Sequence, residues 1–159
     1  MPLHKDNTAG AVFSDDRKHR YILWREWDRR KPSIMFIGLN PSTANESEPD
    51  RTITRIIDFT KDWGYGGFYM VNIFTQVTED PRKLDKIKNC TPDELLMEFA
   101  KECDKIVFAW GNFKEARERS KAIIAMFPEA YCLVKNKNGS PRHPLYIKGT
   151  TQLIKFNEL

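Results

Sequence analysis

Two asparagines are placed where a side-chain amide can recognise a ligand. Asn40 lies in the segment GLNPST, in which Gly38 lets the backbone approach a ligand closely and Pro41 fixes the loop. Asn72 ends the apolar run YMV, where a buried amide needs partners or costs about 1–3 kcal/mol. An amide offers both a donor and an acceptor, the combination with which Asn pairs with the edge of a nucleic-acid base. The alternatives are structural: Asn40 belongs to a helix-capping loop, and Asn72 ties down a neighbouring loop.

His143 is the best candidate for catalysis. It precedes a proline in the segment SPRHPLY, which holds the loop stiff, and histidine titrates nearest to neutral pH. The surrounding segment 135–148 contains four lysines and arginines, Arg142 among them, and no acid. The alternative is a structural histidine.

A possible anion-binding turn follows the apolar run IVFAW. Gly111 and Asn112 lead from this run into a segment with helical periodicity. Free backbone N–H groups at the start of a helix suit an anion such as phosphate, although many α/β turns of this kind bind nothing.

Several common catalytic designs are missing from the sequence. It contains neither a GxxxxGK phosphate loop nor a GxGxxG dinucleotide motif, and no serine or cysteine lies in a strained elbow motif. No pair of histidines or carboxylates has metal-ligand spacing. The three cysteines, Cys90, Cys103 and Cys132, are scattered. We therefore expect neither a metal site, a cofactor nor a disulfide framework.

Length and composition indicate one folded domain spanning residues 1–159. Forty per cent of the residues are apolar and 30% are charged, which excludes a disordered or collagen-like chain. No apolar run approaches the ~20 residues that span a bilayer, and the first residues do not resemble a signal peptide. We expect a cytoplasmic protein without a membrane partner. The net charge of +4 permits an anionic partner without requiring one.

Alternating strand and helix patterns are expected to position these residues. Such alternation predicts a parallel sheet with helices on both faces, and ligands bind such sheets beyond the carboxyl ends of the strands. Segments 40–45, 72–78, 111–114 and 140–146 should therefore meet at one edge. The predicted elements are a hairpin (Ala11–Phe13 and Arg20–Trp27), strands Ser33–Leu39, Phe68–Phe74, Lys105–Trp110 and Ala130–Val134, and three helices. These helices run from Asp50 or Thr52 to Trp63, from a capping box at Thr91–Glu94, and over Lys114–Phe127.

The four segments, in this order, resemble the motifs of the uracil-DNA glycosylase superfamily. IMFIGLNPS is similar to its first motif, YMVNIFTQVT to the strand whose Asn reads the base, IVFAWGNFK to the phosphate-gripping loop, and RHPLY to the last motif. The resemblance covers roughly residues 33–148. It implies a three-layer α/β/α sandwich around a four-stranded parallel sheet, here with an added N-terminal β-hairpin.

The resemblance also implies a mechanism without metal or cofactor. Asn40 would position the attacking water, and Asn72 would bond the edge of a flipped base. His143 would stabilise negative charge on the departing base. Two further roles follow from the family: Gly111 and Asn112 would hold a phosphate of a nucleic-acid partner, most readily DNA, and Leu145 or Tyr146 would fill the gap left in the base stack.

The chain also departs from the efficient uracil enzymes. It has Asn40 where they have Asp, which implies slower cleavage, and Ser42 where they have a Tyr that excludes a 5-methyl group. Their uracil-stacking aromatic residue has no aligned match, which leaves Phe59, Trp63 and Phe74 as candidates, with Phe74 included in the predicted site. Three acids, Glu46, Glu48 and Asp50, follow the first loop and are unfavourable beside a phosphate track.

A closer resemblance is to an uncharacterised bacterial and phage domain family. The shared segments are RYILWREWD, GLNPSTA, WGYGG, HPLY and the spacing of Asp50, Thr52 and Arg55. The spacing of Asp50 and Arg55 at a helix start is expected to give either a local salt bridge or a substrate contact that the repair enzymes lack. Three functions stay open. The first is a DNA glycosylase or other base-processing enzyme that acts on a mismatched or modified pyrimidine. The second is a nucleic-acid or nucleotide binding module that has lost cleavage, and the third is an enzyme that acts on a small nucleoside or nucleotide.

Overall fold

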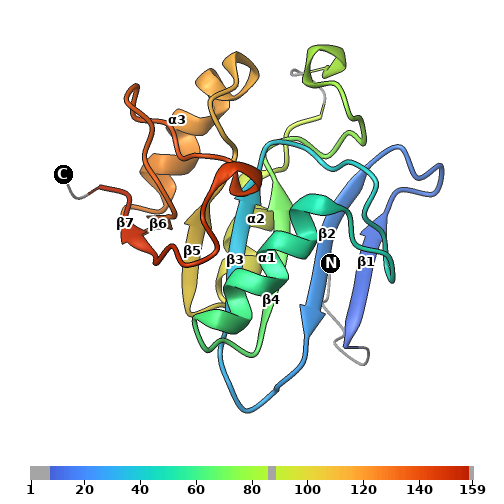
Figure 1. The fold of residues 1–159 in the computed structure, drawn as a ribbon. Coiled ribbons are helices and arrows are strands. Elements are labelled where there is room, and N and C mark those ends of the chain that lie inside the picture. Colours follow the sequence, from blue (N-terminus) through green and yellow to red (C-terminus); the bar gives the residue numbers. More distant parts are fainter. Residues whose placement is uncertain (1–7, 86–88, 158–159) are drawn as a thin grey trace.

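The computed structural model describes residues 8–85 and 89–157, which form one mixed sheet with helices on both faces (Figure 1). Within this part of the chain the sheet has seven strands in the order β1-β2-β4-β3-β5-β6-β7. The strands are β1 (Ala9–Phe13), β2 (Arg20–Glu26), β3 (Ser33–Gly38), β4 (Gly67–Asn72), β5 (Lys105–Phe108), β6 (Tyr131–Cys132) and β7 (Ile154–Lys155).

The expected α/β class is confirmed, but the sheet is larger and more mixed than predicted. Strands β4, β3, β5 and β6 pair with one another in parallel. The predicted hairpin is present as β1 and β2, and β2 extends the sheet by pairing antiparallel with β4. At the other edge, β7 pairs antiparallel with β6. Strand β7 was not predicted, because two residues are too few to show a period of two.

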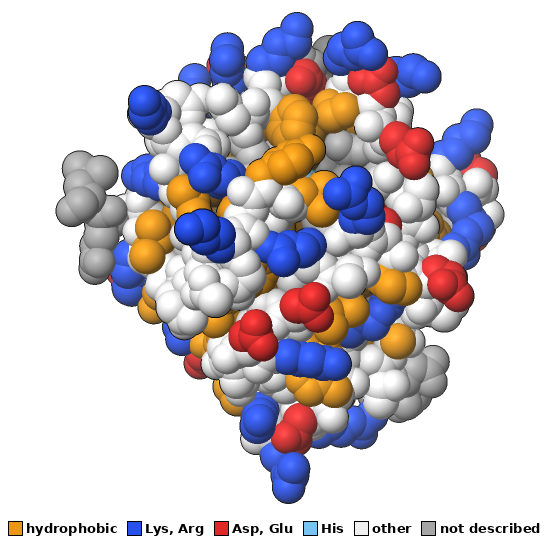
Figure 2. Space-filling view, in the orientation of Figure 1, with side chains coloured by type: hydrophobic (Ala, Val, Ile, Leu, Met, Phe, Trp, Pro, Cys, Tyr) orange, Lys and Arg blue, Asp and Glu red, His pale blue; other side chains and the backbone are white. Residues whose placement is uncertain are grey.

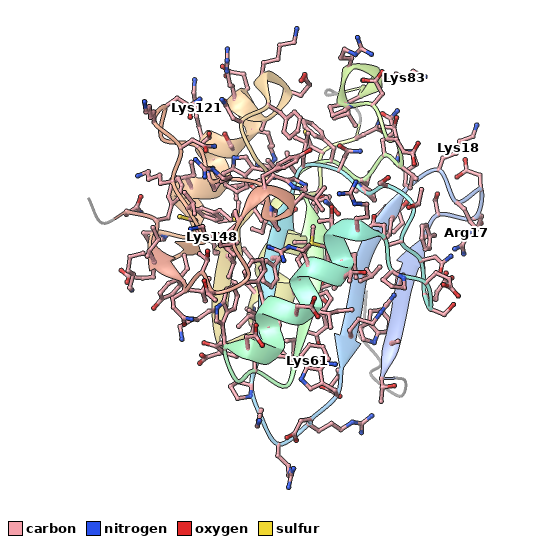
Figure 3. All side chains as sticks on the ribbon, in the orientation of Figure 1. Arg17, Lys18, Lys61, Lys83, Lys121 and Lys148 are labelled. Carbon is pink, nitrogen blue, oxygen red and sulfur yellow. The ribbon has the colours of Figure 1, made fainter. Side chains whose placement is uncertain are left out.

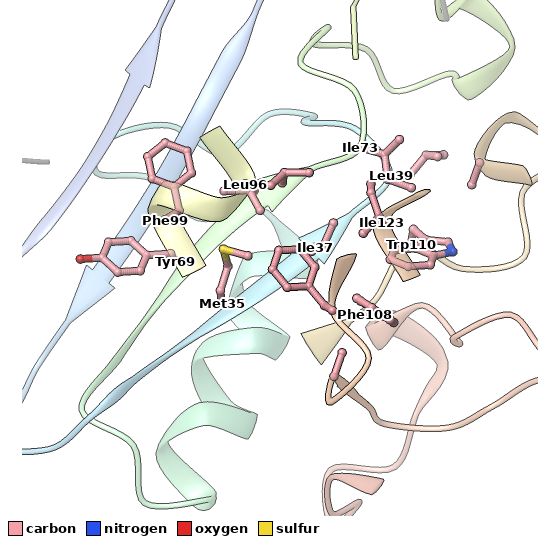
Figure 4. Close-up of a cluster of buried hydrophobic side chains, with 14 of the residues drawn as sticks. Met35, Ile37, Leu39, Tyr69, Ile73, Leu96, Phe99, Phe108, Trp110 and Ile123 are labelled. Carbon is pink, nitrogen blue, oxygen red and sulfur yellow. The ribbon is translucent and has the colours of Figure 1, made fainter. Parts of the chain in front are cut away.

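Three α-helices cover the sheet. Helix α1 (Arg51–Asp62) packs on one face through Ile53, Ile56 and Phe59, against Ile34 and Phe36 of β3. Helices α2 (Asp93–Ala100) and α3 (Arg117–Met126) pack on the opposite face. Figure 4 shows this second cluster, in which Met35 and Ile37 of β3 meet side chains of α2, α3 and β5. Successive residues of β3 thus enter opposite cores, as in a strand buried on both sides.

The helix starts follow the sequence in one case and differ in two. Asp50 caps α1, accepting a hydrogen bond from Ile53 N at 2.9 Å. The predicted capping box before α2 is wrong: the N-cap is Pro92, and the Thr91 hydroxyl instead donates to the Asn72 carbonyl. The predicted third helix begins as a 3₁₀ turn, η2 (Lys114–Ala116), before α3.

Chain order creates a crevice between β3 and β5. From β3 the chain crosses by α1 to β4 on one side, and from β5 it crosses by α3 to β6 on the other. Such a reversal opens a crevice beyond the carboxyl ends of the strands. Figure 1 shows the segments that follow β3, β4, β5 and β6 gathered at the upper edge of the sheet. Among the described residues no helix is long and apolar enough to cross a membrane.

Candidate functional site

A cavity of about 260 Å³ opens at this crevice. All four parallel strands contribute to its wall through the segments that follow them, β2 adds Arg20, and the start of α1 adds Asp50 and Thr52. Its polar and aromatic lining includes Arg20, Asn40, Ser42, Asp50, Asn72, Thr78, Glu79, Phe113 and His143. Separate parts of the sequence therefore converge on one small polar cavity.

The side chain of Asn72 is held by a buried arginine. Arg20, only 3% exposed, donates from Nη2 to Asn72 Oδ1 at 3.2 Å and from Nη1 to the Ala44 carbonyl at 3.2 Å. A guanidinium can only donate, so the amide must turn its oxygen toward Arg20 and its NH₂ group away. Among the described residues Asn72 Nδ2 has no hydrogen-bond partner, which leaves a donor for a ligand in the cavity that Asn72 lines.

Two further features define this corner. Burial lowers the pKa of Arg20 from 12.5 to about 10, against the opposing charge of Asp50. Arg20 Nε is buried and has no partner in the described part of the chain. A Cβ at Gly38 would lie 2.5 Å from Met70 Cε and 2.8 Å from Asn72 Nδ2, so a larger residue here would displace both side chains.

Asn40 joins two loops at the mouth of the cavity. Its Nδ2 donates to the carbonyl of Pro41 at 3.0 Å and to that of Thr78 at 2.7 Å. The amide nitrogen therefore links the segment after β3 to the segment after β4. The remaining group, Oδ1, can only accept a hydrogen bond, from water or from a ligand.

His143 lies in the cavity wall as a neutral imidazole. It is the N-cap of the 3₁₀ helix η3 (Pro144–Tyr146), and its Nδ1 accepts from Leu145 N at 3.2 Å. Burial lowers the pKa of His143, and the charge of Asp50 opposes this shift. An accepting Nδ1 places the ring proton on Nε2, so His143 is a hydrogen-bond donor to a ligand.

Asp50, Thr52 and Arg55 connect α1 to the cavity and to η3. Asp50 caps the helix and lines the cavity beside Thr52. Arg55 donates to the Ile147 carbonyl, and its guanidinium lies 4.8 Å from the centre of the Phe59 ring. Arg55 thus fastens the segment that carries His143 onto α1.

The cavity gathers half of the predicted site. The predicted residues that line it are Gly38, Asn40, Pro41, Ser42, Asn72 and His143. Phe74 does not line it, because the ring is 1% exposed and packs in the core beside Ile73 and Leu39. The other stacking candidates, Phe59 and Trp63, stack on each other at the C-terminal end of α1.

The predicted phosphate-binding turn is occupied by internal contacts. Gly111 N donates to the Pro141 carbonyl at 2.9 Å, and Asn112 Oδ1 accepts from Asn138 Nδ2 at 2.6 Å. Both residues line a neighbouring hollow and not the cavity. The expected free N–H of Gly111 is therefore absent in this part of the structure.

The residues of the last motif surround the cavity from outside. Leu145 lines an adjoining groove with Ser42 and Asp50. Tyr146 is 79% exposed, and its ring centre lies 6.4 Å from that of His143. Arg142 is exposed and donates to Asn136.

Several residues that line the cavity were not among the predicted site residues, and they include Arg20, Asp50 and Phe113. Arg20 lies in a strand whose irregular alternation was the one available signal. Asp50 was expected to cap the helix, and its spacing to Arg55 was expected to give either a local salt bridge or a substrate contact. Phe113 is 36% exposed and supplies the only aromatic ring among the described cavity-lining residues other than the imidazole of His143. Its exposure could not be read from the neighbouring WGN segment.

Charges around the cavity are mixed. Glu46 accepts two hydrogen bonds from the guanidinium of Arg17 in the hairpin, at 2.7 and 2.8 Å. This bidentate ion pair lowers the pKa of Glu46 to about 2. Figure 3 shows Lys18, Lys83 and Lys121 around the upper edge, while Lys61 lies at the far end of α1. Figure 2 shows basic side chains with acidic ones among them on the face crossed by α1.

No group of three or more His, Cys, Asp or Glu side chains among residues 8–85 and 89–157 is arranged to hold a metal ion. The fold and cavity define an α/β protein with a polar cavity at the carboxyl edge of its parallel strands. Residues 20–145 match the family described as "Protein of unknown function (DUF1643)", and the chain belongs to this family. Neither the curated proteins nor the solved structures yielded a match.

Proposed function

We propose that this protein hydrolyses the N-glycosidic bond of a mismatched or modified pyrimidine in DNA. The observation that carries the proposal is the meeting of two fixed donors, Asn72 Nδ2 and His143 Nε2, in one small cavity. A pyrimidine carries ring carbonyl oxygens, and those acceptors become more negative as the base departs. Fixed donors aimed at developing charge are the arrangement that lowers such a barrier.

Four residues that line the cavity have a part in this reaction. Asn72 donates to a carbonyl at the edge of the base, and Phe113 offers a ring face against which the base packs. His143 donates to the departing base, and because it is neutral it needs no proton transfer to do so. Asn40 Oδ1 accepts a hydrogen bond from the attacking water.

The size of the cavity supports a single base as the occupant. At about 260 Å³ it lies just below the roughly 300–1,000 Å³ range of drug-sized ligand sites. In duplex DNA the base would have to leave the stack, and the exposed Tyr146 beside the cavity is suited to occupy the gap. The small Ser42 leaves room for a substituent at the 5-position of the ring.

The arrangement of helices on both faces of the sheet also supports the resemblance to the glycosylases. With α1 on one face and α2 and α3 on the other, the chain fits a three-layer α/β/α sandwich. The motifs that resemble this superfamily lie at the carboxyl edge of its parallel strands.

A free nucleoside or nucleotide is the second candidate substrate. Asp50 and Glu79 both line the cavity, and carboxylates repel the phosphates of a DNA strand. A nucleoside lacks that backbone and would enter past these acids without penalty.

The test is an assay for abasic sites in duplex and single-stranded oligonucleotides that carry uracil, thymine mismatches or 5-modified pyrimidines. Free pyrimidine nucleosides are assayed in parallel for base release. We expect cleavage by the wild-type protein and its loss in Asn40→Ala and His143→Ala. Release from nucleosides alone would favour the second candidate. Salt-dependent DNA binding without cleavage of any substrate would indicate a binding module and refute hydrolysis.

A further inference from the structure

We propose that Asp50 is the general base that accepts a proton from the attacking water. This inference rests on the proposed function and adds the group that the Asn at position 40 cannot supply, since an amide does not accept a proton at neutral pH. Among the described residues that line the cavity, three side chains have a carboxylate or imidazole: Asp50, Glu79 and His143.

His143 is excluded by its hydrogen bonds. Its Nδ1 lone pair accepts from Leu145 N, and its Nε2 carries the ring proton. To take a second proton the ring would have to give up the bond that caps η3. Burial also disfavours the charged imidazolium, which makes His143 a donor and not a base.

Asp50 is fixed in place, and Glu79 is not. Asp50 is half-buried, and Oδ1 is held by Ile53 N at 2.9 Å, while Oδ2 has no hydrogen-bond partner among the described residues. Glu79 is exposed on the loop after β4, and no hydrogen bond or ion pair holds its side chain within residues 8–85 and 89–157. A general base must be positioned within hydrogen-bond reach of the water, so the anchored carboxylate is the better candidate.

The surroundings of Asp50 point to a ligand site and not merely to a helix cap. The buried guanidinium of Arg20 lines the same cavity with an unpartnered Nε, and it interacts electrostatically with Asp50. The other charged or titratable side chains that line this cavity are His143 and Glu79. Asp50 also faces the adjoining groove, which gives water a route to the carboxylate.

The step balances as a hydrolysis. The water oxygen forms a bond to the anomeric carbon of the sugar while the carbon–nitrogen bond breaks, and the electron pair of that bond stays on the base. The water proton passes to Asp50, and His143 donates a hydrogen bond to the departing anion. Asp50 then releases its proton to solvent and returns to the carboxylate. The departed nucleobase anion takes up a proton from solvent and becomes neutral.

The test compares Asp50→Asn with the wild-type protein on the substrate that the wild type cleaves best. Asn is as good an N-cap as Asp and keeps the oxygen that accepts from Ile53 N, but it cannot take the proton. We expect the turnover number to fall about 10²- to 10⁴-fold, the usual contribution of a general base. The unfolding temperature and the affinity for the free base should stay unchanged.

Two variants serve as controls. Asp50→Ser also keeps a capping oxygen and should lose turnover to a similar extent, which guards against a fold defect in a single variant. Asp58→Asn removes the same charge from an exposed position of α1 outside the cavity and should leave turnover unchanged.

The outcomes separate this inference from the proposed function. An active wild type with an Asp50→Asn variant within threefold of its turnover would overturn the role of Asp50 and leave the hydrolase proposal standing. Loss of turnover in Glu79→Gln, with Asp50→Asn still active, would assign the base to Glu79. A wild type that releases no base from any oligonucleotide or nucleoside would overturn both proposals together.

Discussion

Arg20 should set the ligand preference of the cavity by orienting the Asn72 amide, and Arg20→Met tests this. Methionine is of similar length but carries no charge and no donor. The variant frees the Asn72 amide to rotate, so that it presents either its NH₂ group or its oxygen to the cavity. The wild-type protein should bind a ring with a carbonyl at the reading edge, such as uracil, better than one with an amino group, such as cytosine.

The expected change in stability follows from two opposing effects. The fall in the Arg20 pKa from 12.5 to about 10 corresponds to roughly 3 kcal/mol of cost for burying the charge at neutral pH. Removing Arg20 relieves that cost but leaves Asn72 Oδ1 and the Ala44 carbonyl without a partner, at about 1–3 kcal/mol each. The free energy of unfolding should therefore lie between ~1 kcal/mol above and ~3 kcal/mol below that of the wild type.

Arg20→Met should change the ratio of the affinities for uracil and cytosine more than it changes either affinity alone. A fixed amide orientation is worth about one hydrogen bond, so the preference for uracil over cytosine should fall about tenfold. Titration of each free base followed by calorimetry or NMR measures both affinities, and urea unfolding measures the stability. An unchanged preference in a folded Arg20→Met variant would refute the idea that Arg20 orients Asn72.

Three further predictions concern the walls of the cavity. Because burial lowers the pKa of His143, the unfolded chain binds the proton more tightly; the free energy of unfolding should fall as pH drops below about 6.5. Urea unfolding at pH 8 and pH 5 should show a smaller loss of unfolding free energy in His143→Gln than in the wild type. An equal loss in both proteins would contradict the prediction. Gly38→Ala should weaken base binding at least about tenfold, because its Cβ would displace Asn72 Nδ2; unaltered affinity in titration would count against the close approach. Arg55→Ala should cost about 1–3 kcal/mol by freeing the Ile147 carbonyl, with faster hydrogen exchange around His143 than in the wild type; unchanged exchange would show that Arg55 does not hold this segment.

Much of the fold could be predicted because the strands that form its centre are apolar on both faces. Ser33–Gly38 and Gly67–Asn72 are fully buried, and their composition alone indicates parallel strands covered by helices. The short strand β7 and the antiparallel pairing of β2 with β4 were not predicted, because partner choice depends on contacts between distant segments. The Thr91 hydroxyl shows the same limit: a residue typical of a helix cap donates instead to a neighbouring strand.

For the candidate site, the sequence predicts which segments meet but not which way their side chains point. The ends of parallel strands share one edge, so the approach of Asn72 and Asn40 to each other follows from sequence order. The direction in which each side chain at that edge points does not follow from sequence order. Phe74 turns into the core, while Phe113 turns to the cavity. Gly111 follows its strand as predicted, yet its N–H is used by the neighbouring loop.

The hairpin is part of the site and not an addition beside it. Arg20 and Arg25 both leave β2 toward the loop after β3, where Arg20 donates to the Ala44 carbonyl and Arg25 to the Asn45 carbonyl at 2.7 Å. Burial lowers the pKa of both arginines, so each lies where its charge is costly. Hydrogen bonds from these two arginines therefore fix the loop after β3, which contributes Asn40 to the cavity. The family match begins at Arg20, which holds Asn72, and ends at Leu145, whose N–H fixes the ring of His143, so the matched segment contains both of these contacts.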